Sequence, residues 1–78
     1  MEATMARIQT ESGVRNVQTD EYKGCKVEVV TGYDPMSDKW PVHVYIDGTK
    51  VVGRWLSDRM EEAFEHGFMV AAQEIDQR

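Results

Sequence analysis

The chain has 78 residues, a hydrophobic fraction of 41% and a formal net charge of −5. This length accommodates one domain, and a core so small is expected to need a disulfide, a metal ion or a partner subunit for full stability. The single cysteine excludes an intrachain disulfide, and the Cys/His spacing of a structural zinc site is absent from the sequence. We therefore expect a homodimer, a protein partner, or both.

The acidic charge balance disfavours broad electrostatic attachment to nucleic acid or to anionic lipid. The first ten residues include Glu2 and Arg7 and hold no apolar run of the length that a secretory signal needs. No stretch reaches the roughly 20 apolar residues of a membrane-spanning helix. We expect a cytoplasmic protein without a membrane segment, in which the lone thiol stays reduced.

Residues 1–21 mix polar and small side chains with isolated apolar ones and show no sustained period of 2 or 3.6. This pattern is typical of a flexible N-terminal arm, with a short strand over residues 14–19 as the alternative. We therefore expect the single domain to occupy residues 22–78.

Residues 22–31 alternate apolar with charged side chains, which predicts a strand with one buried face. Lys26 and Glu28 then point to water. Cys25 has the parity of Val27, so we expect it to face the core as a small hydrophobe, with a reactive thiol as the alternative. Residues 31–39 are rich in turn residues and contain Asp34-Pro35, a step that cannot continue a strand ladder, and are predicted to form a loop.

Asp47-Gly48 lies between two β-rich runs and is a strong signal for a two-residue hairpin turn. The turn then pairs Ile46 with Thr49. Continued along the ribbon, this register sets Trp40 opposite Trp55 on an apolar face. The opposite face of the ribbon carries Pro41, His43, Tyr45, Lys50, Val52 and Arg54.

A helix is predicted from about Arg59 to Gln77, with Asp58 as its N-cap and Glu61 completing a capping box. Its apolar residues recur every three or four positions and form one stripe, and its outer positions are mainly acidic. Gly67 lies within the stripe, where glycine costs about 1 kcal/mol relative to alanine. We expect the helix to approach the sheet closely there, under Trp40 or Trp55.

These elements predict an α+β fold, in which a three-stranded antiparallel sheet packs on one C-terminal helix in two layers, in the order β-β-β-α. The residues resemble a pattern of small uncharacterised bacterial proteins: Tyr22-Lys23-Gly24 opening a strand, Trp40 before alternating apolar residues, and a final helix ending in Ile75-Asp76. The resemblance spans roughly residues 22–76 and implies a compact domain of this order and a bacterial or phage origin. Cys25 and the long polar arm depart from the pattern, and no activity comes with it.

The sequence holds no serine or cysteine nucleophile with a base placed by a known motif, no phosphate-binding glycine loop and no dinucleotide fingerprint. Glu62 and His66 stand four residues apart on the helix and could share a metal ion, but a solvated helical face is the favoured interpretation. We therefore expect no enzyme, and no catalytic, cofactor or metal site.

A sheet covered by one helix leaves its second face bare, and this face is where we expect a partner. The first hypothesis is a non-enzymatic protein-interaction or regulatory domain. The alternatives are a nucleic-acid-binding module using the outer sheet face, and an acidic decoy acting through the exposed carboxylates of the helix. The candidate partner-binding residues are Lys26, His43, Tyr45, Lys50, Val52 and Arg54, and the carboxylates of the decoy are Asp58, Glu61, Glu62 and Glu65.

Overall fold

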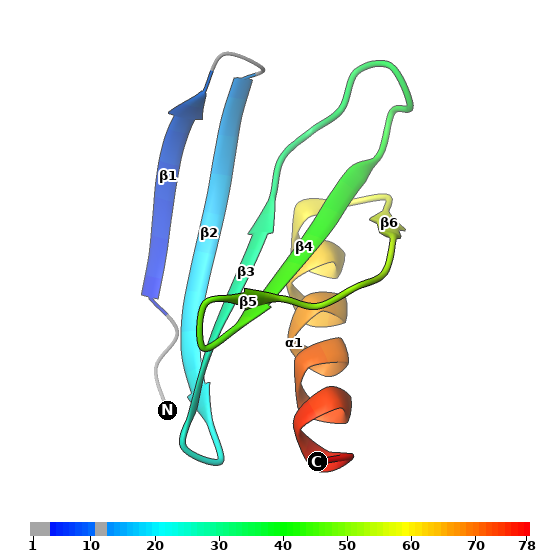
Figure 1. The fold of residues 1–78 in the computed structure, drawn as a ribbon. Coiled ribbons are helices and arrows are strands. Elements are labelled where there is room, and N and C mark those ends of the chain that lie inside the picture. Colours follow the sequence, from blue (N-terminus) through cyan, green and yellow to red (C-terminus); the bar gives the residue numbers. More distant parts are fainter. Residues whose placement is uncertain (1–3, 11–12) are drawn as a thin grey trace.

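The computed structural model describes residues 4–10 and 13–78, with side chains from residue 15 onward. Within these residues one antiparallel sheet packs against one C-terminal helix (Figure 1), so the predicted α+β class is confirmed. The sheet order is β1-β2-β3-β4, and both β5 and β6 pair with β4. The elements are β1 Thr4–Thr10, β2 Gly13–Tyr22, β3 Cys25–Thr31, β4 Trp40–Ile46, β5 Thr49–Lys50, β6 Trp55–Ser57 and α1 Met60–Asp76.

The predicted count of three strands is wrong, because residues expected to form an arm add β1 and β2 to the sheet. The alternative of a strand over residues 14–19 is confirmed, and that strand is longer than predicted. Its alternation is weak for a physical reason: β2 places Gln18 and Asp20 beside Val29 and Val27 on the helix side of the sheet, but α1 lies mainly over β3 and β4 (Figure 1). Residues 1–3 and 11–12 of the expected arm lie outside the described residues.

Two tight turns define the central hairpins. The Asp47-Gly48 turn is confirmed, with φ angles of 50° and 83°, the positive pair that a type I′ turn requires. Lys23-Gly24 makes the same turn between β2 and β3, with φ angles of 50° and 80°. The Asp47 backbone N–H donates to the Lys26 carbonyl at 2.8 Å, and the Lys26 N–H donates to the Asp47 carboxylate at 2.9 Å. The Asp47-Gly48 turn is therefore hydrogen-bonded to β3 as well as to the strands of its own hairpin.

The ribbon after the Asp47-Gly48 turn follows the predicted register only at its start. Val51 donates its N–H to the Val44 carbonyl at 2.9 Å, but further along Val42 pairs with Trp55. The outer strand thus carries two extra residues between these points, and the predicted pairing of Trp40 with Trp55 is wrong. A shift of two residues keeps every side chain on its side of the sheet. Both indoles accordingly pack against the core on the helix side, as predicted.

The core lies between α1 and strands β3 and β4. Gly67 allows the closest approach, because a Cβ built there would lie 2.4 Å from Val29 Cγ1 and 3.1 Å from Val42 Cγ1. The predicted close contact at Gly67 is confirmed, but it is made with valines and not with the tryptophans. Cys25 is half-buried beside the core, on the expected side. The buried apolar residues here are Val27, Val29, Val42, Val44, Ile46, Ala63, Phe64, Ala71 and Ile75.

The helix begins at Met60 with Arg59 as its N-cap, and no side chain caps it. The predicted capping box of Asp58 and Glu61 is therefore wrong. The Asp58 carboxylate forms an ion pair with the Lys39 ammonium instead, at the start of β4. At the other end of α1, Asp76 accepts hydrogen bonds from Lys23 at 2.5 Å and from the Tyr22 hydroxyl at 3.1 Å. An ion pair to a residue beside a strand thus lies near each end of the helix.

Candidate functional site

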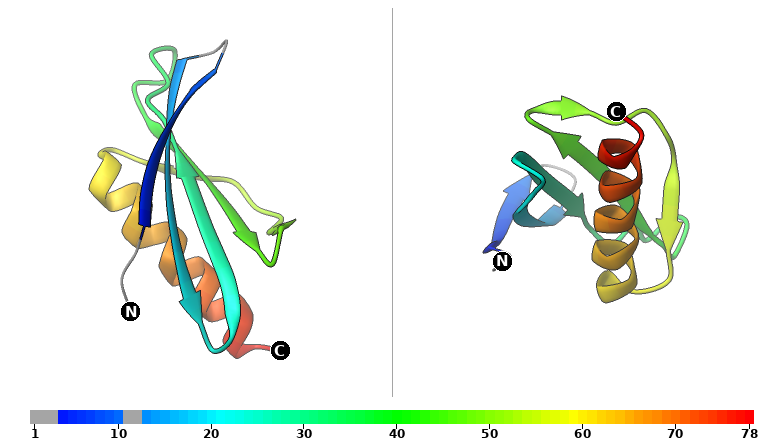
Figure 2. Two further views of the ribbon diagram at one scale, coloured as in Figure 1. Left: turned by 90° about the vertical axis from the view of Figure 1, so that its left-hand side faces the viewer. Right: turned by 90° about the horizontal axis from the view of Figure 1, so that it is seen from below.

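The sheet face opposite α1 carries no helix among the described residues, and Figure 2 shows the helix on one side of the sheet only. We call this the outer face. Cross-strand pairing places Val17 beside Val30, Val30 beside His43, and Tyr45 beside Lys50. Pro41 lies beside Leu56 on the same face, so the described side chains of the outer face come from β2 to β6.

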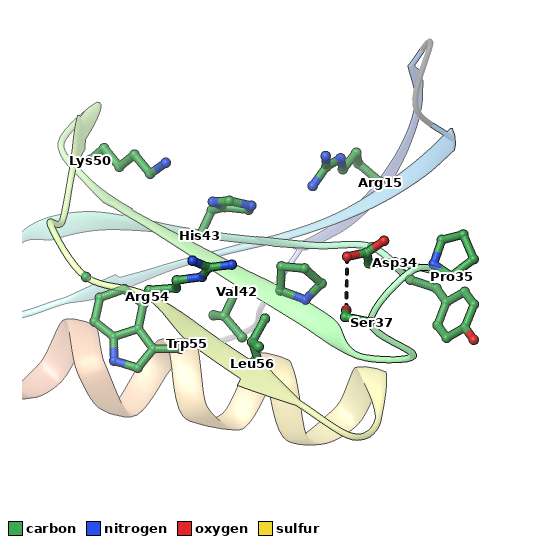
Figure 3. Close-up of a pocket in the computed structure, with 14 residues that line it drawn as sticks. Arg15, Asp34, Pro35, Ser37, Val42, His43, Lys50, Arg54, Trp55 and Leu56 are labelled. Atoms are coloured by element: carbon green, nitrogen blue, oxygen red, sulfur yellow. Dashed lines mark hydrogen bonds between the residues drawn. The ribbon is translucent and has the colours of Figure 1, made fainter.

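Two adjoining hollows mark the outer face, of about 500 Å³ and 560 Å³. Arg15, His43 and Lys50 line both of them, so the hollows form one continuous groove, which we call the outer groove. The first hollow (Figure 3) is lined by Arg15, Gly32, Tyr33, Asp34, Pro35, Ser37, Pro41, Val42, His43, Lys50, Gly53, Arg54, Trp55 and Leu56. The second is lined by Arg15, Val17, Glu28, Val30, His43, Tyr45, Gly48 and Lys50.

His43 occupies the middle of the outer groove because it lies at the centre of β4. Burial lowers the pKa of the imidazole below its usual 6.5, and the positive charges of Lys50 and Arg15 lower that pKa further. The neutral imidazole is therefore the main form at neutral pH. In Figure 3 the side chains of Lys50 and Arg15 extend toward His43 from opposite ends of the groove.

Positive charge dominates the outer groove. Within the described part of the chain, Arg15, Lys50 and Arg54 form no ion pair with a carboxylate. Of the two acidic lining residues, Asp34 accepts hydrogen bonds from the Met36 N–H at 3.1 Å and the Ser37 hydroxyl at 2.9 Å. The second, Glu28, lies 3.6 Å from the Lys26 ammonium. Both carboxylates are thus engaged by neighbours on their own loop or strand.

The groove also has apolar walls. Leu56 pairs with Pro41 across β6 and β4 and is 47% exposed. Tyr33 is 48% exposed, and its ring lies 5.7 Å from that of Trp40 between centroids. An exposed apolar surface beside basic side chains is a common mark of a binding site. The groove can therefore bind a ligand that is partly apolar and partly anionic.

Four of the six residues predicted to bind a partner line the outer groove, namely His43, Tyr45, Lys50 and Arg54. Lys26 lies outside both hollows, next to Glu28. Val52 also lies outside them and is 97% exposed, in the part of the ribbon with the extra residues. Sequence reasoning missed Arg15 because it assigned residue 15 to an arm. The Lys23-Gly24 turn was the available signal, since it predicts a strand before β3.

The other side-chain groups singled out from the sequence lie apart from the groove. Among residues 15–78, no group of three or more His, Cys, Asp or Glu side chains is placed to hold a metal ion. The His66 ring stands edge-on to that of Trp55, with 6.4 Å between centroids, and Glu62 is exposed. The carboxylates of the decoy hypothesis are exposed near the start of α1, where Asp58 is paired with Lys39.

Comparison of the chain with protein-family models, with curated proteins and with solved structures found no match. The helix of the described region falls short of the length and apolarity needed to cross a membrane. The fold and the groove therefore define the class of this chain: a small α+β domain whose sheet carries a basic, partly apolar groove on its open face.

Proposed function

We propose that this chain is a non-enzymatic protein-interaction domain, and that its outer groove holds an extended acidic segment of a protein partner. The observation that carries the proposal is the separation of charge. Arg15, Lys50 and Arg54 gather in the groove, whereas the exposed glutamates of α1 lie on the other layer. An acidic segment is attracted to the groove, and the acidic helix disfavours its binding elsewhere.

The groove has the dimensions of a short extended peptide. Arg15 lies on β2 and Lys50 on β5, three strand spacings apart in the sheet order. Along the strands Lys50 is level with Thr19, four residues from Arg15. At about 4.8 Å per spacing and about 3.3 Å per residue, the two Cα atoms are roughly 20 Å apart, which about six residues of extended chain would span. Side chains of such a segment alternate in direction, so acidic ones can meet Arg15 and Lys50 while apolar ones meet Pro41 and Leu56.

A fluorescently labelled peptide of about eight residues that alternates Glu with Val tests the proposal by fluorescence anisotropy. We expect saturable binding that weakens as salt rises from about 0.05 M to 0.3 M, because the contacts are partly exposed charges. A peptide with Gln in place of Glu should not bind. The proposal is contradicted if the acidic peptide fails to bind at protein concentrations of roughly tens of micromolar.

The variant Lys50→Gln should weaken peptide binding about threefold to tenfold, as expected for the loss of one charged contact. Arg78→Gln is the control, because it removes one positive charge from an exposed residue that lies outside both hollows. Equal effects of the two variants would mean that net charge, and not the groove, attracts the peptide.

A second copy of the chain is the competing occupant of the outer face, because a core of this size gains stability from a partner subunit. Sedimentation equilibrium of the free protein and of its complex with the peptide separates the two cases. We expect the peptide to bind at the same stoichiometry whether or not the chain dimerises. A dimer that the peptide dissociates would assign the outer face to self-association.

Single-stranded nucleic acid is the second candidate ligand, because the rings of His43 and Tyr45 lie among basic side chains in the groove. Such rings can stack on bases while the cations neutralise phosphates. The net charge of −5 argues against it. Fluorescence anisotropy with short labelled single strands at low salt distinguishes the two candidate ligands. Tighter binding of a single strand than of the acidic peptide would favour nucleic acid.

A further inference from the structure

Three nitrogen-bearing side chains from three strands line the outer groove, with His43 between the other two. Arg15 comes from β2, His43 from β4 and Lys50 from β5, and all three line both hollows. Figure 3 shows the guanidinium and the ammonium directed toward the imidazole from opposite sides. The two cations are close enough to act electrostatically on His43.

The remaining ionisable neighbours do not neutralise this cluster. In the first hollow these are Tyr33, Asp34 and Arg54, and in the second they are Glu28 and Tyr45. Asp34 is occupied by two hydrogen bonds within its own turn, and Glu28 lies against the Lys26 ammonium. The cluster therefore presents donors and positive charge that form no ion pair with a carboxylate among the described residues.

We propose that His43 is the centre of an oxyanion-binding site, with Arg15 on one side and Lys50 on the other, which takes a carboxylate or a phosphoryl group of the bound segment. This inference rests on the proposed function and names the group that the groove recognises. Arginine presents a planar fork of donors, lysine adds a mobile ammonium, and the imidazole contributes a donor between them. Donors from three separate strands restrict the position of the anion more than one exposed cation would.

The site couples anion binding to the protonation of His43. Burial and the two cations lower the pKa of the free imidazole, and an anion between the cations offsets their effect, so the pKa of His43 is higher in the complex. Affinity then rises as the pH falls through the pKa of the complex, and it levels off below the pKa of the free protein. Each unit of difference between these two pKa values gives about a tenfold change in affinity.

The pH dependence also distinguishes the two possible sources of the oxyanion. A glutamate side chain, with a usual pKa of about 4.3, stays ionised over the range in which His43 takes up its proton. A phosphoserine loses part of its charge near its second pKa of about 6. The affinity of a Glu peptide should therefore rise more steeply as the pH falls below neutral than that of a phosphoserine peptide of the same length.

NMR spectroscopy of the histidine side chains tests the site directly, because the chain contains two histidines. The acidic peptide and inorganic phosphate should each shift the His43 resonances and raise the pKa of the imidazole. His66, on the helix layer and in contact with Trp55, is the internal control and should not respond. The variant H43Q keeps a side-chain donor but cannot titrate, so its affinity for the peptide should not rise on acidification.

Failure of the site is distinguishable from failure of the proposed function. If the peptide binds while His43 does not respond and H43Q keeps the pH dependence, the oxyanion site is wrong and the interaction domain stands. If phosphate shifts His43 but no acidic peptide binds, the site stands and the proposed function is wrong. If neither ligand affects His43 or binds, both proposals are overturned.

Discussion

At the scale of single residues, Gly67 shows how one position determines the distance between the two layers. Its missing Cβ would lie 2.4 Å from one methyl group of Val29 and 2.9 Å from the other. Contacts so short would force the helix away from the sheet. Gly67 therefore lowers the intrinsic stability of the helix, but it allows the helix to pack closely against the sheet.

The substitution Gly67→Ala should lower the free energy of unfolding by about 1–3 kcal/mol, because overpacking outweighs the gain of about 1 kcal/mol in helix propensity. Urea unfolding followed by circular dichroism measures the change. Gln73→Ala is the control, since residue 73 is exposed on the same helix and should change stability by less than about 0.5 kcal/mol. A stabilised Gly67→Ala protein would contradict the close contact with Val29.

At the scale of the elements, the ribbon from β5 to β6 depends on Gly53. A Cβ at residue 53 would lie 2.4 Å from two carbon atoms of the Trp55 ring. The indole covers the backbone of Gly53 in the segment that carries the two extra residues, and Trp55 also lines the first hollow. The shape of the groove is therefore linked to the position of this ring.

The substitution Gly53→Ala should displace the Trp55 ring and shift its fluorescence emission to longer wavelength, as the indole becomes more exposed to water. The measurement is made in a Trp40→Phe background, so that Trp55 is the sole tryptophan. Val52→Ala is the matched control, because Val52 is 97% exposed and adjacent. An unchanged emission spectrum in Gly53→Ala would argue against the contact between the ring and residue 53.

The ion pair at the end of α1 predicts a dependence of stability on pH. The hydrogen bond from Lys23 is the main cause that lowers the pKa of Asp76 below its usual 3.8. Burial raises this pKa, and the hydrogen bond from the Tyr22 hydroxyl lowers it further, so the net shift is downward. A carboxyl whose pKa is lower in the folded state stabilises the protein above its unfolded pKa, and this contribution is lost as the pH falls through the folded pKa.

Asp76→Asn should therefore reduce the loss of stability that the protein shows as the pH falls from about 5 to 2. Urea midpoints across this range measure the effect, which should be small because the pair is exposed. Glu74→Gln removes a charge from the same helical turn without touching the Lys23 contact. If both variants change the pH profile equally, the contact between Lys23 and Asp76 contributes nothing specific.

At the scale of the whole molecule, β2 connects the fold to the groove. It pairs with β3 from residue 16 to residue 22, buries Asn16 and Val17, and supplies Arg15. Without β2, the strand β3 would become an edge of the sheet with unpaired backbone groups.

A fragment of residues 22–78, the domain expected from sequence, should therefore lose cooperative thermal unfolding and binding of the acidic peptide. A fragment of residues 11–78 keeps β2 and Arg15 and should retain both. Circular dichroism and fluorescence anisotropy measure the two properties. Cooperative unfolding of 22–78 would show that β2 is not needed for the fold.

The local features of the fold were predictable from sequence because they depend on neighbouring residues. The alternation in β3, the Asp47-Gly48 turn and the apolar stripe of α1 each need only a short segment. Gly67 also indicated a close helix approach before its partners were known. The same reasoning placed His43, Tyr45 and Lys50 on the uncovered face.

Features that depend on distant parts of the chain were decided by tertiary structure. Asp58 does not cap the helix because its carboxylate binds Lys39, which lies nineteen positions earlier in the chain. Trp40 does not pair with Trp55 because the outer strand carries two extra residues near Gly53. Sequence by itself determined which side chains share a face, since this follows from a local period of two. Tertiary packing decided which strands join, and that Arg15 and His43 line the same groove, because it brings together residues that no local pattern relates.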